Sequence, residues 1–189
     1  MLLFCSIEAD SEKDKNKILE KSLKKIAKGN TDAISDIYDV VNASLYGYIL
    51  SFLKNPEEAE DVLQDTYVKI CQSAGLYHSQ GKPMAWIYTI ARNLSLMRLR
   101  SRSRFTDMEE FEWEQISSNN SDFHVEDRAV LEVALSKLSK EDSQIVMLHA
   151  VAGMKHREIA DMYDMPLATV LSKYNRAIKK LKNELVNDI

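Results

Sequence analysis

Apolar residues recur at intervals of three and four along most of this chain, and this spacing places them on one face of an α-helix. Residues 32–53 show the pattern most fully, at positions Ile34, Ile37, Val41, Leu45, Tyr48, Ile49 and Phe52. The 189 residues include five Gly and three Pro, which are too few for the many tight turns of a sheet protein. The sequence therefore predicts an all-α fold.

Further helices are expected on both sides of this one. A helix over 10–28 is closed by Gly29-Asn30, and Pro56 suits the first turn of the next helix. The inward positions of that next helix are Val62, Leu63, Tyr67 and Ile70. A loop over 76–83 precedes a fourth helix. Its residues at core spacing are Trp86, Ile87, Ile90, Leu94 and Met97.

The helical period returns at residue 128 after an interruption. One stripe consists of Leu131, Leu135 and Leu138. Ser139 is a suitable N-cap for the helix that follows, and this helix is expected to end at Gly153. Its expected buried residues are Ile145, Leu148 and Val151. Two more helices are predicted, at 155–163 and 167–185.

The net charge of −4 hides an alternation of charged blocks along the chain. Residues 82–104 hold cations and no acidic residue, whereas residues 105–127 hold eight acidic residues and no Lys or Arg. Such alternation indicates separate surfaces for separate partners. The acidic block is also rich in Ser and Asn, as a flexible linker is. We therefore expect an N-terminal extension at 1–19 and two small helical domains, 20–104 and 128–185, joined by a flexible acidic linker at 105–127.

The segment from His156 to Val170 reads as a helix, a short turn and a second helix. Ile159, Met165 and Val170 form a hydrophobic wedge between the two helices. The second helix buries a stripe of Val170, Tyr174, Ala177 and Leu181. Its other face presents Ala168, Thr169, Ser172, Lys173, Arg176 and Lys180. Small, hydroxyl and cationic groups together suit a DNA major groove, although an ordinary helical hairpin with a solvated basic face would also fit.

Aromatic residues and arginines are combined between Tyr77 and Arg104. Five arginines from Arg92 onward have no acidic neighbour in the sequence, and they repel one another unless an anion binds. The aromatic residues beside them, Tyr77, Trp86 and Tyr88, suit stacking on unpaired bases. The alternative for Trp86, Ile87 and Ile90 is packing in the core.

Several classes of protein are disfavoured. Cys5 and Cys71 are expected to be free thiols in a reducing cytosol, and no metal-ligand spacing is present. The four histidines are scattered, and no nucleophile–base pair or phosphate loop is seen, so neither an enzyme nor a cofactor or small-molecule substrate is expected. The start of the chain does not resemble a signal peptide, and no stretch is apolar enough for membrane insertion. A cytoplasmic location follows as an expectation.

The order of these motifs resembles a bacterial sigma factor of the sigma-70 family, in its extracytoplasmic-function (ECF, group 4) class, over roughly residues 20–185. The segment Lys25 to Tyr38 resembles the entry to the family's first conserved region. The segment Glu58-Ala59-Glu60-Asp61-Val62-Leu63-Gln64-Asp65-Thr66-Tyr67 resembles the family's most recognisable segment. Trp86-Ile87-Tyr88-Thr89-Ile90-Ala91-Arg92-Asn93 resembles the promoter-melting segment. The helix-turn-helix completes the order.

The resemblance implies a role for each of these parts. Binding of core RNA polymerase is implied for Asp61, Gln64 and Asp65, through the clamp helices of its largest subunit. Contact with the −10 promoter element, including capture of a flipped base by the loop 77–85, is implied for Tyr77, Trp86, Tyr88, Arg92, Asn93, Arg98 and Arg100. Contact with the −35 element is implied for Ala168, Thr169, Ser172, Lys173, Arg176 and Lys180. The acidic linker would thread through polymerase channels.

The chain departs from the family pattern at Met97, where an acidic residue is usual, at Leu171, where a cation is frequent, and in the turn at Met165-Pro166. These departures leave the promoter sequence open and do not disturb the fold. An anti-sigma factor is a possible further partner. The alternative function is a stand-alone helix-turn-helix transcriptional regulator, which would bind DNA without polymerase, usually as a symmetric dimer.

Overall fold

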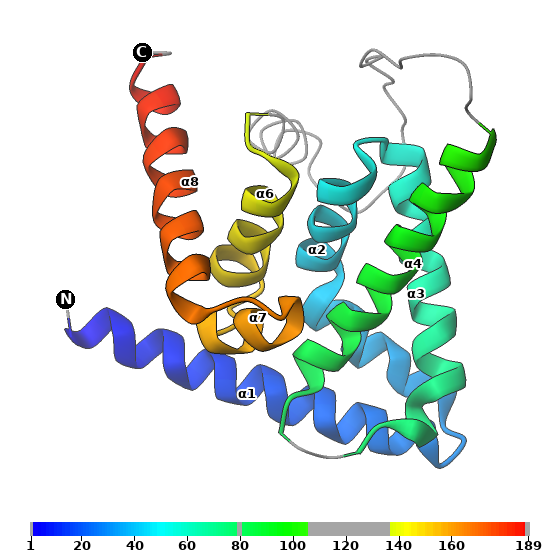
Figure 1. Ribbon diagram of the computed structural model, residues 1–189. Helices are drawn as coiled ribbons and strands as arrows, with labels where there is room; N and C mark the ends of the chain where they lie inside the picture. Colours follow the sequence, from blue (N-terminus) through cyan, green and yellow to red (C-terminus); the bar gives the residue numbers. More distant parts are fainter. Residues whose placement is uncertain (1, 79–80, 106–136, 188–189) are drawn as a thin grey trace.

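The computed structural model describes residues 2–78, 81–105 and 137–187. Every secondary-structure element within these ranges is helical, as predicted (Figure 1). The elements are α1 (Leu2–Ala27), η1 (Thr31–Ala33), α2 (Ile34–Leu53), α3 (Pro56–Ser73), η2 (Ala74–Leu76), α4 (Pro83–Phe105), α6 (Lys140–Val146), η3 (Met147–Val151), α7 (His156–Tyr163) and α8 (Leu167–Asn187). Residues 106–127 of the predicted linker, with Leu131 and Leu135, lie outside the described residues.

Local signals set the ends of these helices. Asn55 caps α3, because its side chain accepts a hydrogen bond from the backbone N–H of Glu58 at 3.0 Å. Ser139 caps α6 in the same way, accepting from Asp142 N–H at 3.2 Å, which confirms the predicted cap. After α1 the chain reverses at Gly29, whose φ of 94° is in the left-handed region that glycine tolerates.

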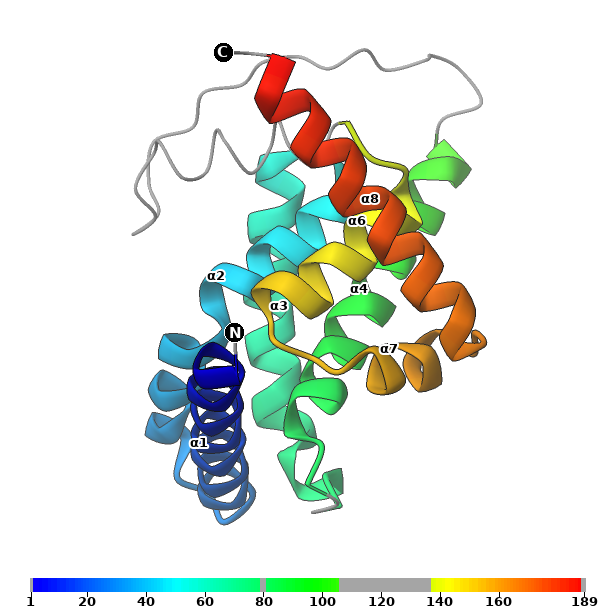
Figure 2. The ribbon, with the colours of Figure 1, turned by 90° about the vertical axis from the view of Figure 1, so that its left-hand side faces the viewer.

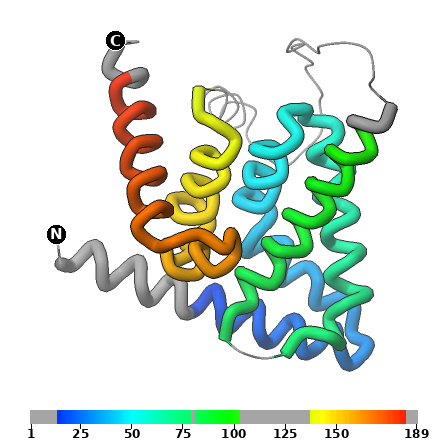
Figure 3. The backbone as a smooth tube through the Cα atoms, in the orientation of Figure 1, coloured from blue at the N-terminus to red at the C-terminus, as the bar shows by residue number. Residues whose placement is uncertain are grey.

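Helix α2 lies at the centre of the molecule, where two groups of helices meet (Figures 1, 2 and 3). The first group, which we call the N-terminal helices, is α1 to α4; the second, the C-terminal helices, is α6 to α8. α2 contacts α3 and α4 on one side and α6 and η3 on the other. One hydrophobic cluster consequently runs from Leu19 and Ile49 to Ile145 and Ile159, all fully buried. The two groups share a core.

The predicted apolar faces are correct in α2 and need correction in α4. The buried face of α4 consists of Met84, Ile87, Tyr88, Ala91 and Ser95. Met97, which was expected at a core position, is 60% exposed. Trp86, Ile90 and Leu94 are half-buried beside this face. The small side chains of Ala91 and Ser95 allow close approach of neighbouring helices, so the buried stripe is turned by about one residue from the expected one.

Val151 is likewise exposed, contrary to the prediction that it is buried. The reason is a π-helical turn, η3, which follows α6 directly. There Ala152 N–H donates to Met147 C=O at 2.9 Å, five residues back rather than four. The wider turn shifts the helical register after Leu148, which is buried, and it turns Val151 outward. The segment then ends at Gly153, as predicted, with φ 78°.

Candidate nucleic-acid interface

Helices α7 and α8 form the predicted helix-turn-helix. The backbone N–H of Lys155 donates to Glu158 Oε2 at 3.0 Å and fixes the start of α7. The helix ends at Tyr163 and is followed by Asp164, which has a left-handed φ of 51°, a conformation that Asp adopts more readily than most residues. The turn is closed by a hydrogen bond from Met165 N–H to Ala160 C=O at 3.0 Å. The turn therefore holds the second helix at a fixed angle.

The predicted wedge between these helices is present. Ile159 and Val170 are fully buried, and Met165 packs against them half-buried. Ala160, at the crossing, is 5% exposed, so its small side chain lies where the helices approach each other. Farther along α8, Ala177 is buried in a smaller cluster with Val146. The inner face of α8 thus follows the predicted stripe.

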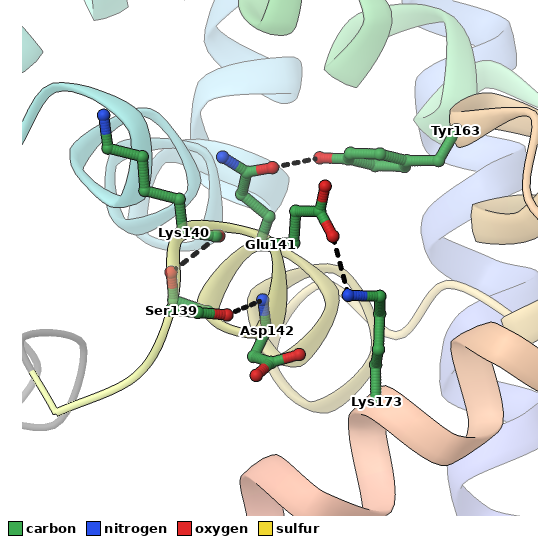
Figure 4. Close-up of polar contacts among 8 residues, drawn as sticks. Ser139, Lys140, Glu141, Asp142, Tyr163 and Lys173 are labelled. Carbon is green, nitrogen blue, oxygen red and sulfur yellow. Dashed lines mark hydrogen bonds and ion pairs between the residues drawn. The ribbon is translucent and has the colours of Figure 1, made fainter.

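The opposite face of α8 is open to solvent over most of its length. Its exposed residues include Ala168, Thr169, Ser172, Arg176 and Lys180, all of them candidates for duplex contact. Lys173 is different, because its ammonium contacts Glu141 Oε2 of α6 at 2.6 Å (Figure 4). Leu171 is 39% exposed on the same helix. The face therefore offers small, hydroxyl and cationic groups, with Lys173 tied back to α6.

The aromatic candidates of the N-terminal helices divide into two kinds. Tyr77 and Trp86 pack together at the start of α4, with ring centroids 5.3 Å apart, and both are half-buried. Tyr88 instead lies in the core with none of its surface exposed, and its hydroxyl donates to Ser44 Oγ at 2.6 Å. Burial raises the pKa of Tyr88. The expectation that Tyr88 stacks on DNA bases is therefore corrected, since α4 turns this ring toward α2.

The basic residues of α4 are not without counter-charges, contrary to the sequence interpretation. Helices α3 and α4 pack antiparallel, so the acidic start of α3 lies beside the basic end of α4 (Figure 1). The guanidinium of Arg98 is 3.6 Å from an Asp61 carboxylate oxygen, and that of Arg102 is 3.7 Å from Glu58. Asp61, a candidate for polymerase contact, is thus paired with a candidate for DNA contact, and the two surfaces adjoin.

The other candidates on these helices are exposed. Gln64 and Asp65 point outward from α3, and Asn93 and Arg100 lie on the exposed surface of α4. Among them, Gln64 and Asp65 follow Asp61 on the same helix by three and four residues, so the three share one face. The structure thus brings the predicted acidic group together on α3.

Arg92 lies where the two groups of helices meet. Its guanidinium carbon is 5.0 Å from the ring centroid of Tyr163, the last residue of α7. The Tyr163 hydroxyl donates to Gln144 Oε1 at 3.0 Å and lies 2.8 Å from the hydroxyl of Tyr48 (Figure 4 shows the contact with α6). We call Tyr48, Arg92, Gln144 and Tyr163 the Tyr163 cluster. Burial raises the pKa of Tyr163 to about 12, so its phenol remains a hydrogen-bond donor.

Sequence reasoning missed this cluster. Tyr48 was expected only as a core residue, and Tyr163 and Gln144 had no assigned role. Periodicity shows which face of a helix is buried, but not which distant helix covers it. The one available signal was the uncommon position of Arg92 among apolar residues of α4.

In the part of the chain that the structure describes, no group of three or more His, Cys, Asp or Glu side chains is placed to hold a metal ion. None of the helices within those ranges is long and apolar enough to cross a membrane. The geometry is that of a helix-turn-helix DNA-binding protein with a second basic and aromatic surface.

Comparison with known families agrees with this class. Residues 37–105 match Sigma-70 region 2, and residues 128–181 match Sigma-70, region 4. The chain is 27% identical over 173 residues to the ECF RNA polymerase sigma factor SigK of Mycobacterium sp. (strain KMS), covering 87% of this chain and 89% of that one. It is 25% identical over 181 residues to the ECF RNA polymerase sigma factor SigW of Bacillus subtilis (strain 168), covering 89% and 97%.

Two solved structures share the fold. CnrH, in its complex with the cytosolic domain of CnrY, superposes with a TM-score of 0.63 at 22% identity, over 93% of this chain and 99% of that one. The sigma factor RpoE of Bartonella quintana, in its complex with the anti-sigma factor NepR, gives 0.67 at 23% identity, over 82% and 98%. The chain belongs to the sigma-70 family of RNA polymerase sigma factors, in the ECF class.

Proposed function

We propose that this protein binds core RNA polymerase and directs it to promoters, with α8 on the −35 duplex and α4 on the −10 element. The observation that carries the proposal is the presence, in one chain and in family order, of an acidic α3 face, an aromatic and basic α4 and an exposed recognition helix. A helix with small and hydroxyl residues at its start enters a major groove closely, while its cations meet phosphates.

Each surface receives one task in this proposal. Asp61, Gln64 and Asp65 bind polymerase, since all three are exposed on one face of α3. Opening of the −10 element falls to Tyr77, Trp86, Arg92, Asn93, Arg98 and Arg100. The −35 element is contacted by Ala168, Thr169, Ser172, Lys173, Arg176 and Lys180, with Lys173 first leaving Glu141.

Further parts of the proposal concern location and partners. The protein acts in the cytoplasm, where promoter DNA and polymerase are found, and it has no catalytic activity of its own. An anti-sigma factor is proposed as a regulatory partner because RpoE, a sigma factor of the same fold, was solved in complex with the anti-sigma factor NepR. The division of the chain at 20–104, 105–127 and 128–185 is retained as part of the proposal.

Run-off transcription tests the function. The full chain and core polymerase are incubated with a randomised promoter library, and transcripts are expected from a subset that shares two elements. A gel shift without polymerase is run in parallel, where a sigma factor should bind promoter duplex poorly. Tight binding by the chain alone, with no transcripts, would instead support a stand-alone regulator.

The proposed role of α8 has a salt test. In the complex with polymerase, Arg176→Ala should reduce the slope of log affinity against log salt concentration by about one unit, because one phosphate contact is lost. Lys182→Ala is the matched control, since Lys182 is exposed on α8 but lies off the Thr169–Arg176 face. Equal slopes for both variants and the wild-type chain would exclude Arg176 as a phosphate contact.

A further inference from the structure

Leu171 is an exposed leucine near the start of α8. Its side chain is 39% exposed, and it belongs to neither hydrophobic cluster of the described residues. Val170, the residue before it, is fully buried and marks the side of α8 that faces the rest of the protein. Each residue turns a helix by about 100°, so Leu171 lies on the flank of the solvent-exposed face. Single exposed leucines are common on proteins, so the meaning of this one depends on its neighbours.

The residues around Leu171 on α8 are small or polar. Ala168 precedes it by three positions and Asn175 follows it by four, while Ser172 is four positions from the first and three from the second. The four side chains therefore form one patch on the helix surface, and all four are exposed. Arg176 adjoins the patch, four positions after Ser172, and is exposed as well. We call Ala168, Leu171, Ser172 and Asn175 the Leu171 patch.

The start of α8 is poor in groups that read guanine. Lys173 is the only Lys or Arg among residues 167–175, all of which the structure describes. Its ammonium contacts Glu141 Oε2 at 2.6 Å, so contact with a base requires this ion pair to break. A bidentate contact of Arg or Lys with guanine is the commonest specific contact in a major groove. The Leu171 patch offers an apolar group in place of such a cation.

Thymine is the base that an exposed leucine suits. Its C5-methyl group is the apolar group that distinguishes the four unmodified bases in the major groove, where the other specific groups are hydrogen-bond donors and acceptors. Packing the methyl group against an aliphatic side chain removes apolar surface of both from water. The burial of one such group corresponds to about a fourfold change in affinity.

We propose that Leu171 determines specificity in the −35 element by packing against the methyl group of a thymine. The inference rests on the proposed function, which places α8 in the −35 duplex. The small side chains of Ala168 and Ser172 allow the helix to approach the base edges closely, which brings Leu171 within reach of a methyl group. A phosphate contact by Arg176 carries no sequence information, whereas the contact by Leu171 does.

The test exchanges thymine for uracil, which removes the methyl group and leaves base pairing unchanged. Core polymerase with the full chain is bound to a promoter selected from the randomised library, and each thymine of its upstream element is replaced by uracil in turn, on both strands. At least one replacement should weaken binding of the wild-type complex about fourfold. At that position the complex with Leu171→Ala should bind the thymine and uracil promoters equally, because the side chain that contacts the methyl group is gone.

Val151→Ala is the matched control. Val151 is 44% exposed, much like Leu171, but it lies in η3 and not on α8. The complex with this variant should keep the fourfold preference for thymine. Circular dichroism of both variants should match that of the wild-type chain, because each substitution shortens an exposed side chain.

A third variant changes the base that is read. With Leu171→Arg, selection from the same library should replace thymine at the sensitive position by guanine, because Arg pairs with guanine O6 and N7. A residue that only stabilised the fold would lower transcription without changing the selected base. An unchanged selected base with Leu171→Arg would therefore count against the inference.

Failure of the inference differs from failure of the proposed function. If the library yields transcripts but no thymine of their shared upstream element is sensitive to uracil, the inference is overturned and the proposed function stands. A general loss of binding in Leu171→Ala would then assign Leu171 to a contact with polymerase. If the sensitivity persists in Leu171→Ala, another residue contacts the methyl group, and the inference is overturned as well. If no member of the library is transcribed, the proposed function fails and the inference fails with it.

Discussion

Tyrosine hydroxyls connect helices of this molecule at several buried or half-buried positions. Tyr67 bonds Asn42, Tyr88 bonds Ser44, and Tyr48 bonds Tyr163. In each pair an aromatic ring fills the core while a single polar atom finds a partner on another helix. Because a buried hydroxyl that loses its partner is costly, each pair also specifies which helices lie together.

The Tyr88 pair can be tested by stability. Tyr88→Phe should lower the free energy of unfolding by about 0.5–1.5 kcal/mol, since one buried hydrogen bond is lost. Ser44→Ala should cost about 1–3 kcal/mol, because it leaves the Tyr88 hydroxyl buried without its acceptor. The double variant should cost less than the sum of the two, as urea unfolding can measure. Additive costs would show that the hydroxyls do not interact.

A pair of histidines predicts sensitivity to acid. Burial, together with neighbouring His149, lowers the pKa of His156 from its ordinary 6.5, and the two rings lie 3.7 Å apart. Below that pH the unfolded chain takes up a proton that the folded chain resists, so stability falls as pH decreases and is regained above about 6.5.

His156→Gln should therefore make the urea midpoint less dependent on pH between about 7.5 and about 5.5. His78→Gln is a suitable control, because His78 is exposed in the loop before α4. If the wild-type chain and His156→Gln lose the same stability on acidification, the histidine pair does not account for the effect.

At the scale of single elements, α6 shows how much a short helix depends on its ends. It has seven residues, fewer than an isolated helix needs, so its cap and its packing hold it in place. Ser139→Ala removes the cap and should lower stability by about 1 kcal/mol. Ser139→Asp, which can also cap, should retain most of it. Thermal unfolding monitored by circular dichroism distinguishes the two, and equal losses would argue against the cap.

The positions of the helices were predicted from the sequence more reliably than the residues that each helix buries. The helices near residues 32–53 and 167–185 were found because their apolar spacing is regular over many turns. The prediction for Val151 was wrong because a π-helical turn cannot be recognised from the spacing of apolar residues. The prediction for Tyr88 was wrong because an aromatic residue near arginines is compatible both with stacking on bases and with packing in a core. The helix-turn-helix was predicted correctly because its wedge and its exposed face follow from short-range pattern alone.

At the scale of the whole molecule, the shared core makes the two groups of helices depend on each other. Ile145 and Leu148 of the C-terminal helices are fully buried in the same cluster as Ile49 of α2. No short-range pattern in the sequence could predict this shared cluster. The apolar spacing of a helix shows that one face is buried, but it does not show which distant helix covers that face. The arrangement of the two halves therefore had to come from the structure.

The consequence for stability can be measured with Tyr48. In the full chain, Tyr48→Phe should lower the free energy of unfolding by about 0.5–1.5 kcal/mol, because the bond to Tyr163 is lost. In a Tyr163→Phe background the partner hydroxyl is missing, and the same substitution should cost less than about 0.5 kcal/mol. Urea unfolding of the four proteins gives both differences, and equal costs would mean that Tyr48 acts only within the N-terminal helices.

The pairing of Asp61 with Arg98 affects how genetic data on this protein would be read. A selection for loss of polymerase binding would be expected to recover substitutions of Arg98 as well as of Asp61. Replacing either residue removes the ion-pair partner of the other and leaves its charge unpaired. A charge-exchanged double variant separates the two effects. Asp61→Arg with Arg98→Asp re-forms the ion pair but reverses the charge presented to polymerase and to DNA. If this double variant recovers folding but not transcription, the two residues act in recognition of these partners and not only in stabilising the fold.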